Sequence, residues 1–156
     1  MTARRRRKAL FLDRDGTINV DYGYVHEKER FEFLPGIFDF CRRAVGLGYS
    51  IFVITNQSGI ARGMFGEREY ASLTRWMKRR FAAEGCPITA VYHCPRLDGP
   101  DRKPAPGLFL RACRRYGIDM AASVSVGDMP RDVEAGKAAG VGRNYLLGES
   151  GFDMPL

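Results

Sequence analysis

The sequence predicts an α/β fold in which an open parallel sheet is covered by helices on both faces, and two observations support this prediction. Short apolar runs alternate with amphipathic stretches along the 156 residues, as expected for strand–helix units joined by right-handed crossovers. The apolar runs are continuous rather than alternating, which is typical of strands buried on both faces. We therefore expect one Rossmann-like sheet.

The expected strands are short, and each is followed by a polar or glycine-containing loop. The first strand, Ala9 to Leu12, ends abruptly at two carboxylates. The later strands are expected at 50–55, 88–93, 123–127 and 144–147. Ligands of open parallel sheets bind just beyond the carboxyl ends of the strands, so these loops are the expected place for a site.

The expected helices lie between these strands and end at glycines. They are expected at about 37–47, 67–83, 107–116 and 131–139. The second has an apolar face at helical spacing, formed by Tyr70, Leu73, Met77 and Phe81. Tyr70 and Trp76 are interpreted as core or interface residues rather than catalytic ones.

Composition and charge indicate an ordinary globular domain with a basic start. Hydrophobic residues make up 45% of the chain and charged residues 28%, and no apolar run is long enough to span a membrane. Residues 1–8 are interpreted as a basic leader that carries much of the net charge of +7. Solvation, a nucleic-acid arm and attraction of a phosphorylated substrate all remain as explanations. A cleaved signal peptide is rejected because it would remove the first strand, so the cytoplasm is the expected location.

The cysteines indicate neither a metal framework nor a disulfide scaffold. Cys41, Cys86, Cys94 and Cys113 are far apart and form no CxxC pair. Cys41 and Cys113 fall in helical patterns, where buried thiols are expected.

Asp13 and Asp15 form the first candidate cluster. Two residues apart on an extended segment, they point to the same side, and two like charges there need a partner such as Mg²⁺. The alternative is a strand that simply ends in an Asx turn.

Three further polar clusters follow later strands. They are Thr55 with Asn56, Lys103, and Asp128 with Asp132. In a parallel sheet all four clusters would lie at one edge and can form one site, although Lys103 taken alone could be an exposed loop lysine.

These residues resemble the motifs of the haloacid dehalogenase-like phosphatases, beginning with the stretch Asp13-Arg14-Asp15-Gly16-Thr17. The resemblance implies a nucleophilic Asp13, a general acid/base Asp15, and a phosphoryl-holding Lys103. It also implies hydrogen bonds from the Thr55 hydroxyl and the Asn56 N–H to a phosphoryl oxygen. Mg²⁺ would bind Asp13, the carbonyl oxygen of Asp15, and Asp128, with Asp132 bracing the loop. Residues 9–156 would form a single phosphatase domain without a separate cap domain.

Longer stretches resemble one group of that family, the D-glycero-D-manno-heptose 1,7-bisphosphate phosphatases and their histidinol-phosphate phosphatase relatives. The stretches 13–26 and 55–63 carry most of this similarity. It implies substrate contacts from Asp21, Tyr22, Gly23, Tyr24, Asn56, Gln57, Ser58 and Arg102. Arg102 can clamp a remote phosphate, and Gln57 and Ser58 can hydrogen-bond sugar hydroxyls. The two tyrosines offer flat faces for a sugar ring, or pack within their loop.

The chain departs from the group's pattern in three places. Of the zinc-loop ligands after the third strand only Cys94 is present, with Arg96 where a histidine is expected, so no structural zinc is expected. Met129 replaces a common lysine. The chain stops soon after its last strand, and another subunit could cover that end of the sheet.

The resemblance predicts an Mg²⁺-dependent enzyme that removes the phosphate at position 7 of heptose 1,7-bisphosphate through an aspartyl phosphate, in the supply of surface polysaccharide precursors. Alternatives are a histidinol-phosphate or other small phosphomonoester phosphatase, a nucleic-acid 3′-phosphatase, and a non-catalytic phosphosugar binder. The expected partner is a small phosphorylated sugar rather than nucleic acid or a membrane, and a homo-oligomer is left open.

Overall fold

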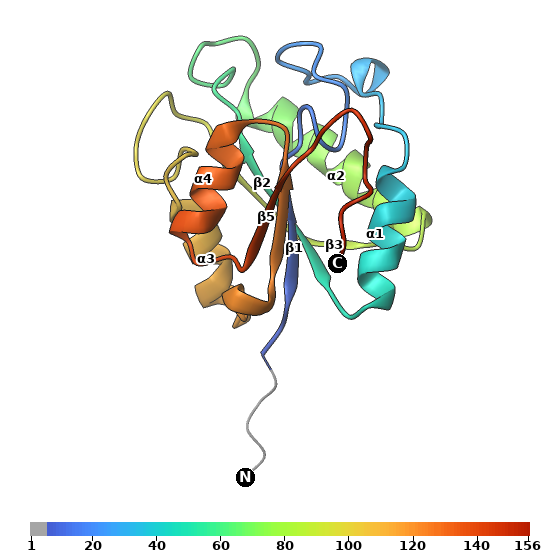
Figure 1. Ribbon diagram of the computed structural model, residues 1–156. Coiled ribbons are helices and arrows are strands. Elements are labelled where there is room, and N and C mark those ends of the chain that lie inside the picture. Colours follow the sequence, from blue (N-terminus) through green and yellow to red (C-terminus); the bar gives the residue numbers. More distant parts are fainter. Residues whose placement is uncertain (1–5) are drawn as a thin grey trace.

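A computed structural model describes residues 6–156, which form a five-stranded parallel sheet with helices on both sides (Figure 1). The strand order is β3-β2-β1-β4-β5. The bounds are β1 Ala9–Leu12, β2 Ser50–Asn56, β3 Ile88–Cys94, β4 Val124–Gly127 and β5 Arg143–Leu146. The predicted fold class is confirmed.

The strand register brings the ends of the central strands to one edge of the sheet. Leu12, the last residue of β1, pairs with Val53 of β2 on one side and with Val126 of β4 on the other. All of these pairings are parallel. The residues that follow β1, β2 and β4 therefore leave the sheet at the same edge.

Two helices cover each face of the sheet (Figure 1). The helices are α1 Ile37–Gly46, α2 Glu67–Ala83, α3 Gly107–Tyr116 and α4 Pro130–Ala138, with short 3-10 helices at Lys28–Arg30 and Met120–Ala122. On one face, side chains of α1 and α2 such as Phe40 and Met77 pack on Leu10 and Leu12. On the other, α3 and α4 pack on Ala9 and Phe11. Successive residues of a strand point to opposite faces, so β1 contributes to both cores.

The observed helices and strands differ from the expected ones by one residue at several ends. The helix expected to end at Leu47 ends at Gly46, and the last strand is Arg143–Leu146 instead of 144–147. The expected apolar face of α2, from Tyr70 to Phe81, is buried.

Part of the expected basic leader contacts the folded domain, while residues 1–5 lie outside the described residues. The Arg7 N–H donates to the Gly117 carbonyl, and the Asp119 N–H donates to the Arg7 carbonyl. Lys8 Nζ lies 4.2 Å from the centroid of the Tyr49 ring. Arg7 and Lys8 are therefore attached to the folded domain, although Arg7 remains exposed.

The segment after β5 covers part of the α1 face. Phe152 stacks on Phe40 with 5.2 Å between ring centroids, and Arg43 Nη2 donates to the Met154 carbonyl at 2.8 Å. Met154 is buried in the core cluster of that face. The chain itself thus covers part of this face, whereas Arg143 and Leu146 at the two ends of β5 are exposed. In the part of the chain that is described, no helix is long and apolar enough to cross a membrane.

Candidate active site

A cavity of about 400 Å³ opens at the carboxyl edge of the central strands. Its lining includes most residues singled out from the sequence: Asp13, Asp15, Asp21, Gly23, Tyr24, Asn56, Gln57, Ser58, Arg102, Lys103 and Asp128. These residues come from loops after four different strands. The strand-end clusters therefore do surround one site.

Lys103 is the buried centre of the site, with a side chain that is only 2% exposed. Its ammonium donates to Asp13 Oδ1 at 2.9 Å and to the Ile54 carbonyl at 2.6 Å, and lies 2.7 Å from Asp132 Oδ1. Two of these contacts are hydrogen bonds, and the contact with Asp132 is an ion pair. Lys103 is thus not an exposed loop lysine.

Burial and neighbouring charges shift the pKa of both partners. Burial raises the pKa of Asp13 to about 8, against the opposing effect of Lys103 and with support from the charges of Asp132 and Asp128. Burial by itself would lower the pKa of Lys103, but the charges of Asp13 and Asp132 outweigh this and raise it. Lys103 is therefore charged, and Asp13 lacks enough positive charge around it to ionise readily.

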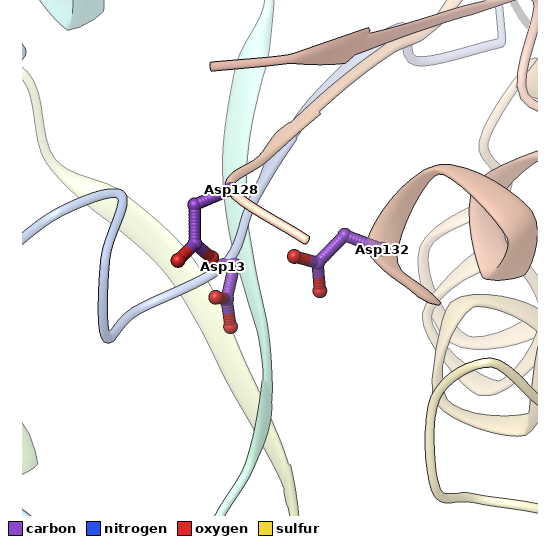
Figure 2. A group of neighbouring side chains, drawn as sticks. All are labelled: Asp13, Asp128 and Asp132. Atoms are coloured by element: carbon purple, nitrogen blue, oxygen red, sulfur yellow. The ribbon is translucent and has the colours of Figure 1, made fainter. Parts of the chain in front are cut away.

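The residues around Asp13 fit a divalent cation. Carboxylate oxygens of Asp13, Asp128 and Asp132 lie within 4.8 Å of one another, and Figure 2 shows the three carboxylates facing a common space. Asp128 Oδ1 is buried without a hydrogen-bond partner, and burial raises the pKa of Asp128. Carboxylate oxygens are the ligands that Mg²⁺ prefers, and a cation here would compensate the charge that Lys103 leaves uncompensated. Asp132 Oδ2 accepts a hydrogen bond from the Met129 N–H and its Oδ1 faces Lys103, whereas only Oδ1 of Asp13 faces Lys103. Asp13 and Asp128 are therefore the carboxylates with an oxygen open to a metal.

The carboxylate of Asp15 has its own partners and does not depend on a cation to offset its charge. Arg14, whose side chain is 1% exposed, lies 3.1 Å from Asp15 Oδ2. Asn19 Nδ2 donates to Asp15 Oδ1 at 3.0 Å, and Gln57 Nε2 donates to Oδ2 at 2.9 Å. The charge that requires a cation is instead on Asp13, Asp128 and Asp132.

Thr55 does not line the cavity, whereas Gln57 lines it as expected and also connects Thr55 to Asp15. Thr55 is 1% exposed, does not line the cavity, and accepts a hydrogen bond from Gln57 Nε2 at 2.9 Å. The same amide nitrogen donates to Asp15, so Gln57 joins Thr55 to the carboxylate of Asp15. Asn56 does line the cavity and exchanges two hydrogen bonds with the main chain of Lys103.

The loop 21–24 contributes three of its four residues to the cavity. Asp21 Oδ1 accepts a hydrogen bond from the Gly23 N–H at 3.0 Å, which shapes the turn. Tyr22 is the exception, because it does not line the cavity and its hydroxyl donates to Glu32 Oε2 at 2.6 Å. The substrate contact expected of Tyr22 is therefore not supported by its position, whereas Tyr24 lines the cavity.

Four cavity residues were not assigned a role from the sequence: Gly59, Arg62, Met129 and Arg131. Arg62 and Arg131 join Arg102, so that three arginines line the cavity. Among the described residues, none of the three forms an ion pair. Arg62 lies in a glycine-containing loop and Arg131 within the stretch Gly127 to Asp132. The position of each arginine within a recognised motif is the sequence signal that could have identified it as a cavity residue.

The region where a zinc loop was considered has other contacts. His93 Nε2 lies 2.8 Å from Glu67 Oε2, and its ring packs on Tyr70. Cys94 is buried, with its thiol near the Arg96 carbonyl. Within the described residues, the only group of three or more potential ligand side chains is Asp13, Asp128 and Asp132.

Comparison with known proteins places this geometry in a family. A family model described as "HAD-hyrolase-like" matches residues 101–147. The chain is 46% identical to D-glycero-beta-D-manno-heptose-1,7-bisphosphate 7-phosphatase of Yersinia pestis, over 89% of this chain and 79% of that protein. It is 47% identical to D-glycero-alpha-D-manno-heptose-1,7-bisphosphate 7-phosphatase of Burkholderia mallei, over 90% and 79% respectively.

A solved structure shares both fold and sequence. It is D,D-heptose 1,7-bisphosphate phosphatase from B. bronchiseptica complexed with magnesium and phosphate, with a TM-score of 0.82 and 33% identity over 90% of this chain and 80% of that chain. Sequence identity of this extent, together with the gathered carboxylates and lysine, establishes the relationship. The chain belongs to the haloacid dehalogenase-like hydrolases, in the family of the heptose 1,7-bisphosphate phosphatases.

Proposed function

We propose that this protein removes the phosphate at position 7 of D-glycero-D-manno-heptose 1,7-bisphosphate with the help of Mg²⁺. The observation that carries the proposal is the arrangement of Asp13, Lys103 and Asp128 around one cavity, in a chain 46% identical to an enzyme named for this reaction. The fold by itself hosts many substrates, so the side chains around the cavity must decide between them.

Asp13 is the proposed nucleophile. One of its carboxylate oxygens forms a bond to phosphorus, and the bond from phosphorus to the oxygen at C7 breaks. Asp15 gives its proton to that leaving oxygen. Water then attacks the phosphorus of the acyl phosphate, releasing phosphate and restoring the Asp13 carboxylate, while Asp15 takes up the proton of the water.

The neighbours of these two residues explain why they are suited to different roles. Lys103 Nζ, 2.9 Å from Asp13 Oδ1, holds the nucleophile and compensates charge on the transferred group. Arg14, Asn19 and Gln57 fix the orientation of the Asp15 carboxyl. Mg²⁺ bound by Asp13, Asp128 and the carbonyl oxygen of Asp15 would neutralise charge on the phosphoryl group.

The three arginines favour a substrate with a second phosphate. Lys103 already contacts Asp13, Asp132 and the Ile54 carbonyl, whereas Arg62, Arg102 and Arg131 line the cavity without an ion pair in the described part of the chain. A guanidinium binds phosphate through two parallel hydrogen bonds. Histidinol phosphate carries an amine and an imidazole instead of a second phosphate, so it offers no second anionic group for these guanidiniums to bind. Arg131 also supplies positive charge next to Met129, where relatives often have lysine.

The described part of the basic leader does not favour nucleic-acid ends as the substrate. Arg6, Arg7 and Lys8 precede β1, whereas Asp13 follows it. These basic residues therefore start at the opposite edge of the sheet from the cavity (Figure 1).

The test is turnover of the two anomers of heptose 1,7-bisphosphate, histidinol phosphate and a 3′-phosphorylated oligonucleotide, each with Mg²⁺ and with EDTA. We expect kcat/KM to be highest for a heptose bisphosphate, with turnover lost in EDTA and in Asp13→Asn. Metal analysis of the pure protein should find no bound zinc. A higher kcat/KM for histidinol phosphate or for the oligonucleotide would refute the substrate assignment, and full activity of Asp13→Asn would refute the mechanism.

Variants of the arginines test the second phosphate site in the same assay. Arg102→Met and Arg131→Met should each raise KM for the bisphosphate about tenfold, because each removes charge-assisted hydrogen bonds. KM for heptose 7-phosphate should change much less. The matched control is Arg111→Met, on α3 outside the cavity and paired with Asp101.

A further inference from the structure

Tyr24 has an unusual backbone conformation at the cavity wall. Its φ is +50°, the only positive φ of a non-glycine residue among the described residues. A residue with a large side chain adopts this left-handed conformation only where its surroundings hold it there. Because Tyr24 lines the cavity together with Asp21 and Gly23, whatever holds Tyr24 also shapes the substrate side of the cavity.

His26 is the group that bonds the main chain of Tyr24. His26 Nδ1 lies 2.9 Å from the Tyr24 carbonyl oxygen, and in the described part of the chain no other hydrogen bond reaches the backbone of Tyr24. A carbonyl oxygen can only accept, so Nδ1 must carry the proton in this contact. His26 does not itself line the cavity, and therefore acts on it through Tyr24.

The ring of His26 is held in place by a second loop. It stacks on Phe65 with 5.1 Å between centroids and 14° between ring planes. Phe65, which is 5% exposed, immediately precedes the residue that caps α2. His26 Nε2 lies 3.4 Å from Glu27 Oε1 and 3.9 Å from Glu69 Oε2, so acidic side chains stand near the other nitrogen of the ring.

Gly59, which lines the cavity, lies directly against Tyr24 and Phe65. A Cβ at this position would collide with Phe65 Cε1 and come within 3.0 Å of Tyr24 Cδ1. The absence of a side chain lets Tyr24 and Phe65 pack closely over the main chain of the second loop. Tyr24, His26, Phe65 and Gly59 thus form one packed unit behind the cavity wall.

We infer that His26 is a positioning residue, which holds Tyr24 and the loop 21–24 in the conformation that receives the part of the substrate beyond the reacting phosphate. This inference rests on one part of the proposed function, namely that the substrate is a sugar phosphate. Such a substrate extends beyond the phosphoryl group that reacts. The bond to the Tyr24 carbonyl acts on binding, whereas Asp13, Asp15 and Lys103 act on the chemistry.

Two substitutions separate the hydrogen bond of His26 from its ring packing. His26→Phe keeps a ring that can stack on Phe65 but has no donor for the Tyr24 carbonyl. His26→Asn loses the ring and keeps an N–H donor close to the place of Nδ1. Gly59→Ala is an independent variant, because it leaves His26 intact and displaces Tyr24 and Phe65.

The first measurement determines KM and kcat separately for each variant, on the sugar phosphate that the wild-type enzyme turns over best. For His26→Phe and Gly59→Ala we expect KM to rise about fivefold, as for the loss of one hydrogen bond, with kcat within about twofold. His26→Asn should restore KM to within about twofold of wild type. Hydrolysis of acetyl phosphate, which has no sugar, should be unchanged in the two His26 variants. Unchanged KM in His26→Phe, or equal losses on acetyl phosphate, would overturn the inference.

Hydrogen exchange of the peptide 20–26 provides a readout that needs no substrate. Exchange should be faster in His26→Phe than in wild type and close to wild type in His26→Asn. Equal exchange in wild type and His26→Phe would show that the bond does not hold the loop. If the heptose bisphosphates are not substrates, the proposed function fails, whereas the exchange comparison still decides the role of His26.

Discussion

The carboxyl group of Asp13 illustrates how single residues depend on their surroundings. Burial raises its pKa to about 8, although Lys103 lies 2.9 Å away. The reason is that Lys103 is shared with Asp132, so one ammonium serves two carboxylates while Asp128 adds a third. In the absence of metal, Asp13 is therefore protonated over much of the range in which an unfolded aspartate is ionised.

This difference predicts how the stability of the metal-free protein depends on pH. With a folded pKa of about 8 and an ordinary value of 3.8, folded Asp13 binds more protons between these pH values than unfolded Asp13 does. The contribution of Asp13 to the free energy of unfolding is therefore full below pH 3.8 and is lost as the pH rises to about 8. We expect the difference in stability between wild type and Asp13→Asn, measured by urea unfolding in EDTA, to follow this trend.

Magnesium should reverse the trend, because a cation favours the ionised carboxylates that bind it. Added Mg²⁺ should raise the melting temperature of the wild type more at pH 8 than at pH 5. Asp128→Asn, which removes one of the two available carboxylates, is the control and should respond weakly. An equal response of the two proteins would contradict the assignment of the metal site.

At the scale of elements, the turns after β1 and β4 bring the metal-binding carboxylates together. Asp132 lies in the first turn of α4, where one of its oxygens accepts a hydrogen bond from the Met129 N–H at 3.0 Å and the other lies 2.7 Å from Lys103. Gly16 follows Asp15 with a φ of +88°, and a Cβ on it would collide with the carboxylate of Asp128. The start of α4 and the turn after β1 thus fix the two sides of the site.

Gly16→Ala tests this close approach. The left-handed backbone should cost about 1–2 kcal/mol of stability, and the added methyl group should displace Asp128. We expect the Mg²⁺ concentration for half-maximal activity to rise by roughly tenfold or more, since a metal ligand is moved.

Gly140→Ala is the matched control for this substitution. Gly140 has a φ of +86°, and a Cβ there would meet nothing within 4 Å. It should therefore lose similar stability with no change in the Mg²⁺ requirement. The same Mg²⁺ requirement in both variants would show that Gly16 matters only for backbone conformation.

At the scale of the whole molecule, the basic residues that precede β1 lie at the opposite end of this strand from the cavity. Arg7 and Lys8 precede β1, whereas Asp13 follows it, and a strand of four residues spans about 13 Å. That distance exceeds the Debye length of about 8 Å at physiological salt. The charges at the start of β1 should therefore have little effect on the binding of a small phosphorylated substrate.

Removal of residues 1–5 tests this separation and retains the contacts of Arg7 and Lys8. We expect KM and kcat for the sugar phosphate to stay within about twofold of the full-length values at physiological salt. A 3′-phosphorylated oligonucleotide serves as the comparison substrate. If the full chain hydrolyses this oligonucleotide and the chain without residues 1–5 does not, the alternative of a nucleic-acid 3′-phosphatase would be supported instead.

The sequence alone was enough to predict the succession of strands and helices along the chain and most of the residues that line the cavity. Continuous apolar runs mark strands that are buried on both faces, and parallel strands bring their carboxyl ends to one edge. Asp13, Lys103 and Asp128 could therefore be placed together, although Asp13 and Lys103 are 90 residues apart.

What only the tertiary structure decided is the direction of side chains in the loops. Tyr22 turns to Glu32, Arg14 is buried against Asp15, and Arg131 faces the cavity. A strand or helix has a period that assigns each residue to a face, whereas a loop has none. The orientation of a loop side chain follows from partners that are distant in sequence, as Gln57 is from Asp15, and these contacts exist only once the chain has folded.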